Sequence, residues 1–146
     1  MRHSKRFSRL IDYAKKQESS AADEMQKARS LLDSLAQQLE QLRGFYHEYA
    51  QRQFAQSGKS YQSFTMMNHY AFLDQLESGV IKMQKQTELA DKQYQHAHQV
   101  WLALHQKTES LSKLQERYIE KEKKVADALE QKMLDDWVQQ VLSQHE

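Results

Sequence analysis

The fold can be inferred from residues 7–53, which read FSRLIDYAKKQESSAADEMQKARSLLDSLAQQLEQLRGFYHEYAQRQ. Alternating steps of four and three residues through this stretch reach fourteen positions, of which twelve are apolar or aromatic. The positions are Phe7, Ile11, Ala14, Glu18, Ala21, Met25, Ala28, Leu32, Leu35, Leu39, Leu42, Tyr46, Tyr49 and Gln53. A period of about 3.5 residues is typical of a helix whose apolar seam is covered by another helix.

A second seam with the same period begins at Met66 and has eleven apolar or aromatic residues among fourteen positions. The positions are Met66, His69, Leu73, Leu76, Val80, Met83, Thr87, Ala90, Tyr94, Ala97, Trp101, Leu104, Thr108 and Leu111. The segment Gln56-Ser57-Gly58-Lys59-Ser60 separates the two seams and contains the residues that favour a turn.

Two heptad helices joined by a short break predict an all-α fold, a long two-helix antiparallel coiled-coil hairpin. We expect one coiled-coil rod over residues 1–146, with a first helix over about 5–55, a turn over about 56–64 and a second helix over about 65–142. If the chain folds back at residue 60, residue i faces roughly residue 120 − i, so Phe7 would lie near Lys113.

The C-terminal helix is predicted to be longer than the N-terminal one. Its apolar residues continue beyond the point where the first helix begins, with a spacing that loosens from 3.5 to four. They are Leu114, Tyr118, Val125, Leu129, Met133, Trp137 and Val141. About 30 residues would then have no helical partner within the chain, and an unpaired apolar stripe needs something to bury against. A partner-binding segment is the interpretation we favour, and a fraying tail is the alternative.

Composition excludes several classes of protein. The 146 residues include no Pro, so long helices can run without a break, and no Cys, which excludes disulfides and thiolate chemistry. The net charge of +1 argues against a general nucleic-acid binder. Residues 1–16 nevertheless carry six basic side chains and one acidic one, which makes a basic helix end. No secretory signal and no membrane-spanning run are apparent, so we expect a cytoplasmic protein.

No motif indicates an enzyme, a cofactor site or a metal site. Ser57-Gly58-Lys59-Ser60 resembles the end of a phosphate-binding loop, but position 53 is Gln where the motif needs Gly, and no strand precedes it. His96 and His98 are two residues apart and would point to different sides of a helix. A two-helix hairpin also lacks the concave pocket in which catalytic groups are positioned.

Several apolar residues fall outside the two seams, namely Leu31, Phe45, Phe72, Ile81, Val100 and Leu102. Phe45 and Phe72 lie near the predicted turn on opposite helices, where they could form one patch with Leu42, Tyr49 and Leu76. Such residues either widen the core or form an exposed anchor for a partner. Both interpretations are compatible with the sequence.

The sequence of residues 38–137 resembles that of the FliJ family, the small stalk-like proteins of the bacterial flagellar type III export apparatus. The resemblance rests on five features: Tyr46-His-Glu-Tyr49, residues 68–77 (NHYAFLDQLE), Trp101 in mid-helix, Leu114-Gln-Glu-Arg117, and residues 127–137. The length of the chain and the unequal hairpin also agree with the family.

The resemblance implies a non-enzymatic protein that looks like the central shaft of rotary ATPases. Such proteins sit in the pore of a hexameric export ATPase, promote assembly of its ring and contact the cytoplasmic linker of the membrane export gate. They are also proposed to escort substrate chaperones. The resemblance therefore implies a cytoplasmic protein, peripherally associated with the inner-membrane export apparatus, without nucleic acid, cofactor or membrane insertion.

Two sets of residues follow from the resemblance by position. The gate contacts would be Gln38, Leu42, Phe45, Tyr49, Phe72, Leu76, Gly79 and Met83. The contacts with the ATPase ring would be Arg6, Arg9, Tyr118, Val125, Leu129, Met133 and Trp137. Leu76 also belongs to the seam, so the sequence leaves open whether it is exposed.

Alternative functions and assemblies stay open at this stage. The chain could be the equivalent stalk of a non-flagellar type III secretion system, or a generic dimerising coiled-coil scaffold or chaperone. A monomeric hairpin and a swapped dimer are also both possible, because the same heptads can pair within one chain or between two.

Overall fold

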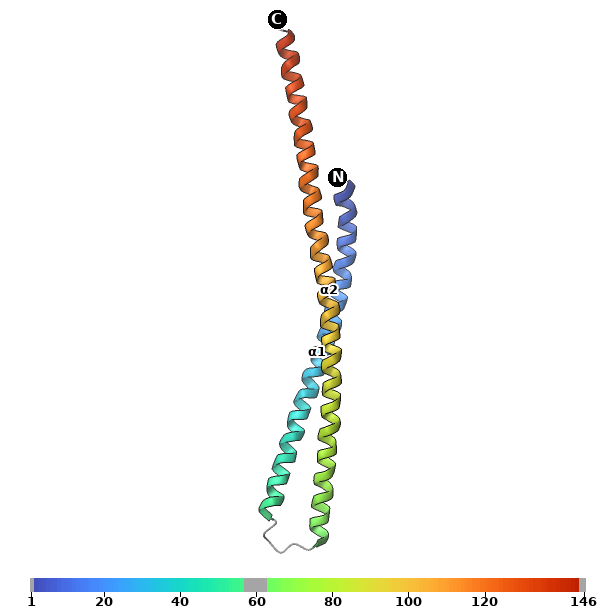
Figure 1. Ribbon diagram of the computed structural model, residues 1–146, viewed down its shortest axis with the longest axis vertical. Helices are drawn as coiled ribbons and strands as arrows, with labels where there is room; N and C mark the ends of the chain where they lie inside the picture. The colour runs from blue at the N-terminus through green and yellow to red at the C-terminus, as the bar shows by residue number, and fades with distance from the viewer. Residues whose placement is uncertain (1, 57–62, 145–146) are drawn as a thin grey trace. The chain divides into compact units, whose positions relative to one another are not determined.

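The computed structural model describes residues 2–56 and 63–144, with side chains described over 4–52 and 65–144. These residues form two α-helices and no strand: α1 spans Arg2–Gln56 and α2 spans Ser63–Gln144 (Figure 1). With 55 residues in α1 and 82 in α2, the predicted all-α hairpin with a longer C-terminal helix is confirmed. The predicted turn sequence Ser57-Gly58-Lys59-Ser60 lies outside the described residues.

Contacts divide the chain into two compact units, and each helix contributes to both. The first unit combines residues 1–20 with residues 102–146, and the second comprises residues 21–101. In each unit a segment of α1 lies beside a segment of α2 (Figure 1). That the two units act as a single rod-like domain stays a prediction.

In the second unit the helices pack antiparallel through their seams. The ring of Tyr49 meets that of Phe72 edge-on, with 4.8 Å between centroids. Further along the pair, the guanidinium of Arg29 lies 5.2 Å from the centre of the Tyr94 ring. Leu39 and Ala90 are buried between the helices. Contacts from late α1 to early α2, and from earlier α1 to later α2, are those of a hairpin.

In the first unit the helices are also antiparallel, but their register differs from the prediction. Phe7 stacks on Tyr118 with ring centroids 5.1 Å apart, so the expectation that Phe7 lies near Lys113 is wrong. Ile11 and Ala14 form the buried core next to this stack. The estimate assumed that the middle of the break marks the fold point, whereas the register is set by which side chains pack together in the seam.

The two predicted seams describe the buried face of the hairpin. Every described seam residue between Phe7 and Tyr49, and every one between Met66 and Leu111, is buried or part-buried. The off-seam apolar residues Leu31, Phe45, Phe72, Ile81, Val100 and Leu102 are all exposed. They therefore do not widen the core, and a role as anchors for a partner stays a prediction.

The pairing of the first unit continues further along α2 than the apolar pattern predicts. Leu114, expected on the continuing stripe, is exposed, and the seam passes instead through Gln115, Tyr118 and Glu122. The side-chain amide of Gln115 donates to the Ser4 carbonyl at 3.1 Å, and Ser4 Oγ donates to a Glu122 carboxylate oxygen at 3.1 Å. The period of 3.5 is therefore kept to Glu122, and a hydrophobicity pattern misses it because Gln115 and Glu122 are polar.

An ionic contact between His105 and Glu18 crosses the helix pair of the first unit. His105 Nδ1 donates to a Glu18 carboxylate oxygen at 2.6 Å, and His105 Nε2 lies 3.3 Å from Glu109. The hydrogen bond from His105 lowers the pKa of Glu18, and the same bond raises the pKa of His105. Both shifts favour the charged pair. Glu18 is one of the two polar positions in the α1 seam, and its partner accounts for its place there.

The two helices were compared with the length and hydrophobicity that a membrane-spanning helix requires. Neither α1 nor α2, over residues 2–56 and 63–144, contains a stretch apolar and long enough to traverse a bilayer.

Candidate docking surfaces

The first candidate surface lies on the second unit, near the C-terminal end of α1 and the N-terminal end of α2. A shallow pocket there is lined by Phe45, Glu48, Tyr49, Arg52, Phe72 and Leu76, which we call the aromatic patch. Its cavity volume is about 270 Å³. Four residues of α1 and two of α2 thus share one face of the helix pair, and four of the six are apolar or aromatic.

Two aromatic rings of the aromatic patch are exposed, and a third is held in the seam. Phe45 and Phe72 are exposed, whereas Tyr49 is part-buried in the seam. The Tyr49 hydroxyl is hydrogen-bonded to His69 Nδ1, and its ring supports Phe72 edge-on. This arrangement offers a partner an aromatic surface whose orientation is already set, which reduces the entropy lost on binding.

The residues expected to contact the gate fall into three groups. Phe45, Tyr49, Phe72 and Leu76 come together in the aromatic patch. Leu42 packs against Gly79, where an added Cβ would lie 3.5 Å from Leu42 Cδ2. Gln38 is exposed and Met83 part-buried, and neither lines the pocket.

The sequence left open whether Leu76 is exposed or belongs to the seam. Leu76 is part-buried in the seam, and it also lines the aromatic patch. Sequence reasoning missed Glu48 and Arg52, which give the patch a charge of each sign. Their spacing was a usable signal: Arg52 follows Tyr49 by three residues and Glu48 by four, so all three share one side of α1.

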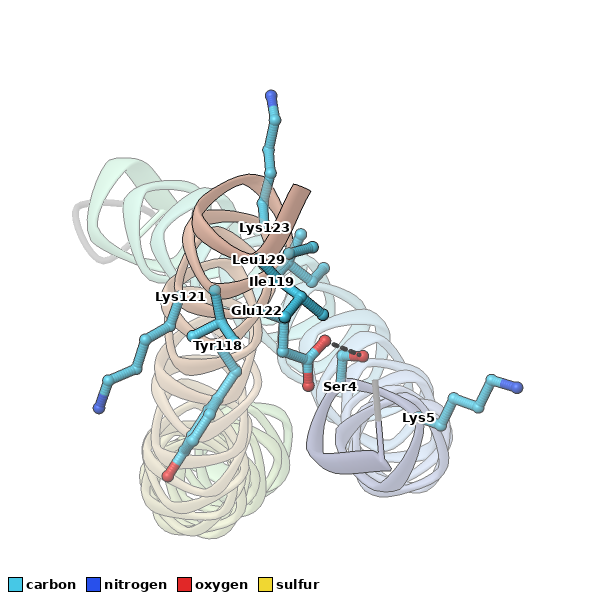
Figure 2. Close-up of a pocket in the computed structure, with 10 residues that line it drawn as sticks. Ser4, Lys5, Tyr118, Ile119, Lys121, Glu122, Lys123 and Leu129 are labelled. Atoms are coloured by element: carbon cyan, nitrogen blue, oxygen red, sulfur yellow. Dashed lines mark hydrogen bonds between the residues drawn. The ribbon is translucent and has the colours of Figure 1, made fainter. Parts of the chain in front are cut away.

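The second candidate surface lies in the first unit, where α2 continues past the first residues of α1 (Figure 1). A groove of about 1020 Å³ is lined there by Ser4, Lys5, Tyr118, Ile119, Lys121, Glu122, Lys123, Val125, Ala126 and Leu129, and we call it the terminal groove. Figure 2 shows the Ser4–Glu122 hydrogen bond between α1 and α2, with lysines directed outward around it.

Beyond the terminal groove, α2 remains helical to Gln144 and carries further exposed apolar side chains. We call these residues the C-terminal stripe: Met133, Leu134, Trp137, Val138 and Leu142. Val141, which was expected in the same stripe, is part-buried. The predicted exposed apolar segment of α2 is thus present as a continuous helix.

The residues expected to contact the ATPase ring are distributed over these two surfaces. Tyr118, Val125 and Leu129 line the terminal groove, with Tyr118 held by Phe7. Met133 and Trp137 belong to the C-terminal stripe. The exposed Arg6 and Arg9 do not line the groove.

Sequence reasoning missed Lys5, Ile119, Lys121 and Lys123 as groove residues, because the groove depends on where α1 begins along α2. Ile119 carried the clearest signal, since it is an apolar residue directly beside the seam position of Tyr118.

The side chains at both surfaces are suited to contacts with apolar and charged groups of a macromolecule. Over residues 2–56 and 63–144, His, Asp and Glu side chains form no group of three or more that could hold a metal ion. Exposed aromatic anchors and a groove along a helix are features by which helical proteins recognise other helices.

Fold and surfaces together define a class, that of helical-hairpin proteins of the coiled-coil type with exposed apolar surfaces. The model of the family described as Flagellar FliJ protein matches residues 3–146, nearly the whole chain. The chain therefore belongs to the FliJ family. No curated protein and no solved structure gives a match.

Membership identifies the protein as a non-enzymatic component of the flagellar type III export apparatus. The matching family is the flagellar one, which favours this assignment over the stalk of a non-flagellar secretion system and over a generic scaffold.

Proposed function

We propose that the protein is a stalk-like coupling rod of the flagellar export apparatus. It binds the hexameric export ATPase, promotes assembly of the ring and contacts the cytoplasmic linker of the membrane export gate. It also binds substrate chaperones, and it is associated peripherally with the inner-membrane export apparatus. The observation that carries the proposal is the exposed apolar segment of α2, residues 123–144, which lies beyond the Ser4–Glu122 hydrogen bond between α1 and α2.

The unpaired segment of α2 is the part that we assign to the ATPase ring. Within it, Val125, Leu129 and Trp137 are all more than half exposed. A protein rarely leaves several large apolar side chains exposed along one helix unless another macromolecule covers them. A ring with a central pore would surround the helix and could bury these side chains on several sides.

The aromatic patch is the surface that we assign to the export gate. Phe45 and Phe72 are exposed aromatic side chains of the kind that dominate binding energy at interfaces. The Tyr49 ring contacts Phe72 edge-on. The mixed charge of Glu48 and Arg52 at the rim provides polar contacts around this apolar centre.

The ATPase assignment is tested by the rate of ATP hydrolysis of the purified export ATPase with and without this protein, while light scattering follows ring assembly. We expect stimulation that rises together with ring formation. Trp137→Ala should weaken it, and Tyr13→Ala is the matched control, because Tyr13 is 61% and Trp137 62% exposed and both lie in the first unit. Absence of stimulation by well-folded wild-type protein at saturating concentration would contradict the proposal.

The gate assignment is tested by binding to the purified cytoplasmic part of the export gate. Phe72→Ala should weaken binding by about tenfold or more, as expected for an aromatic anchor. Tyr70→Ala is the control, because Tyr70 is an exposed aromatic residue of α2 that does not line the aromatic patch. If Phe72→Ala also lowers helicity or ATPase stimulation, Phe72 serves the fold and the assignment is wrong.

A further inference from the structure

The face of α2 that pairs with α1 does not stop where α1 begins. Tyr118 and Glu122 contact Phe7 and Ser4 of α1. On a helix with about 100° per residue, Val125 and Leu129 project within about 60° of these two residues. They are nonetheless 66% and 60% exposed. The next two layers of the same seam are therefore present on α2 and are not covered by α1.

The terminal groove is formed by these uncovered layers. Its floor is apolar, with Ile119, Val125, Ala126 and Leu129 from α2. The Ser4–Glu122 hydrogen bond marks the end at which α1 begins (Figure 2). An α-helix fits this place by the same geometry that α1 uses, because seam residues spaced by three and four accept the side chains of a facing helix.

The rim of the groove is mostly basic. Lys5, Lys121 and Lys123 line it against one acidic residue, Glu122, which accepts the hydrogen bond from Ser4. Figure 2 shows the three lysine side chains extending away from one another. Since Lys121 and Lys123 are two residues apart, they stand on either side of the apolar floor. An acidic partner is favoured on both flanks.

The C-terminal stripe faces another direction. Leu134, Val138 and Leu142 are centred about 160° around α2 from Val125 and Leu129, and Trp137 lies about 100° from that pair, when each residue advances about 100°. A straight helix that occupies the terminal groove therefore faces away from Leu134, Val138 and Leu142. Leu134, Val138 and Leu142 can therefore be altered without changing the floor of the terminal groove.

We propose that the terminal groove binds an acidic amphipathic α-helix of the export ATPase, packed on α2 end to end with α1. The apolar face of that helix covers Val125 and Leu129, and its carboxylates pair with Lys5, Lys121 and Lys123. This inference rests on the proposed function, which it deepens by naming the chemistry of the partner segment.

The test is the dissociation constant of the full-length protein for the purified export ATPase, measured at about 50 and about 200 mM salt. The double variant Lys121→Glu/Lys123→Glu should bind about tenfold more weakly than wild type and should lose most of the salt dependence. The control is Lys85→Glu/Lys92→Glu, which makes the same change of charge at two exposed positions of α2 in the second unit and should stay within about twofold.

The identity of the partner segment is tested in the same complex. A photoreactive amino acid at position 125 should cross-link to an ATPase segment that carries acidic residues beside apolar ones at spacings of three and four. A cross-link to a basic or non-helical segment overturns the inference. A cross-link between two copies of this chain, together with a change in oligomeric state measured by light scattering, also overturns it.

Failure of the inference and failure of the proposed function give different results. If wild type binds the ATPase, the Lys121 and Lys123 double variant binds equally well and only Trp137→Ala weakens binding, the groove proposal is wrong and the stalk proposal stands. Equal weakening by both charge-reversal pairs means general attraction and also rejects the groove. If wild type does not bind the ATPase, both proposals fail.

Discussion

Ile11 and Leu10 are neighbours in the sequence and provide a sharp test of how the first unit is stabilised. Ile11 is 5% exposed and Leu10 is 52% exposed. Replacement by Ala removes three carbon atoms in either case, and each fully buried carbon is worth about 0.8 kcal/mol. Since Ala is a better helix former than Ile, we expect Ile11→Ala to destabilise by about 2 kcal/mol and Leu10→Ala by about 1 kcal/mol or less.

The measurement is urea unfolding followed by circular dichroism at 222 nm, with both variants and wild type at the same protein concentration. Equal slopes against urea would show that the variants unfold to similar states, so that the midpoints can be compared. The reasoning is refuted if Leu10→Ala costs as much as Ile11→Ala, or if Ile11→Ala costs less than about 0.5 kcal/mol. Either result would mean that α1 is not buried against α2 at Ile11.

Further predictions concern pH and two glycines. The pKa of His105 is raised and that of Glu18 is lowered in the folded protein, so their pairing stabilises the fold fully between about pH 4.5 and 6.5. This stabilisation is lost as the pH rises through the folded pKa of His105, and also as the pH falls through that of Glu18. In urea titrations, the free energy of unfolding of His105→Gln should therefore fall less between about pH 6 and 8 than that of wild type. An equal fall in both proteins would contradict the role of the pair. Gly79→Ala should stabilise by about 0.5–1 kcal/mol, because φ is not positive and the new Cβ would meet Leu42 at an ordinary 3.5 Å. Gly44→Ala, where nothing lies within 4 Å, should give a similar gain in melting experiments, and destabilisation at Gly79 alone would show that Leu42 has no room to adjust.

The period of the apolar residues was sufficient to predict the helices and their buried faces. Strict spacing from Phe7 to Tyr49 and from Met66 to Leu111 marks one face of each helix, and those faces are the covered ones. Even polar members of the seams, Glu18 and Thr108, are part-buried or buried. The prediction succeeded because helix geometry alone decides which residues share a face.

The candidate surfaces were predicted only in part. Phe45 and Phe72 were singled out because they fall outside the seams, and Trp137 because it lies on α2 beyond the predicted beginning of the first helix. The charged rims of both surfaces, including Arg52 and Lys121, were not recognised. A charged side chain on a helix is usually a solvated one, and nothing in its own sequence context shows that an apolar pocket lies beside it.

Helix number, helix type and the buried faces were thus contained in local sequence, since period and the absence of Pro are properties of neighbouring residues. Only the tertiary structure decided the register, with Tyr118 rather than Lys113 against Phe7, and the continuation of pairing to Glu122. Register depends on many side-chain contacts between distant segments, and a heptad pattern is nearly unchanged when one helix slides along the other by a repeat. The place where α1 begins on α2, and with it the terminal groove, follows from that register alone.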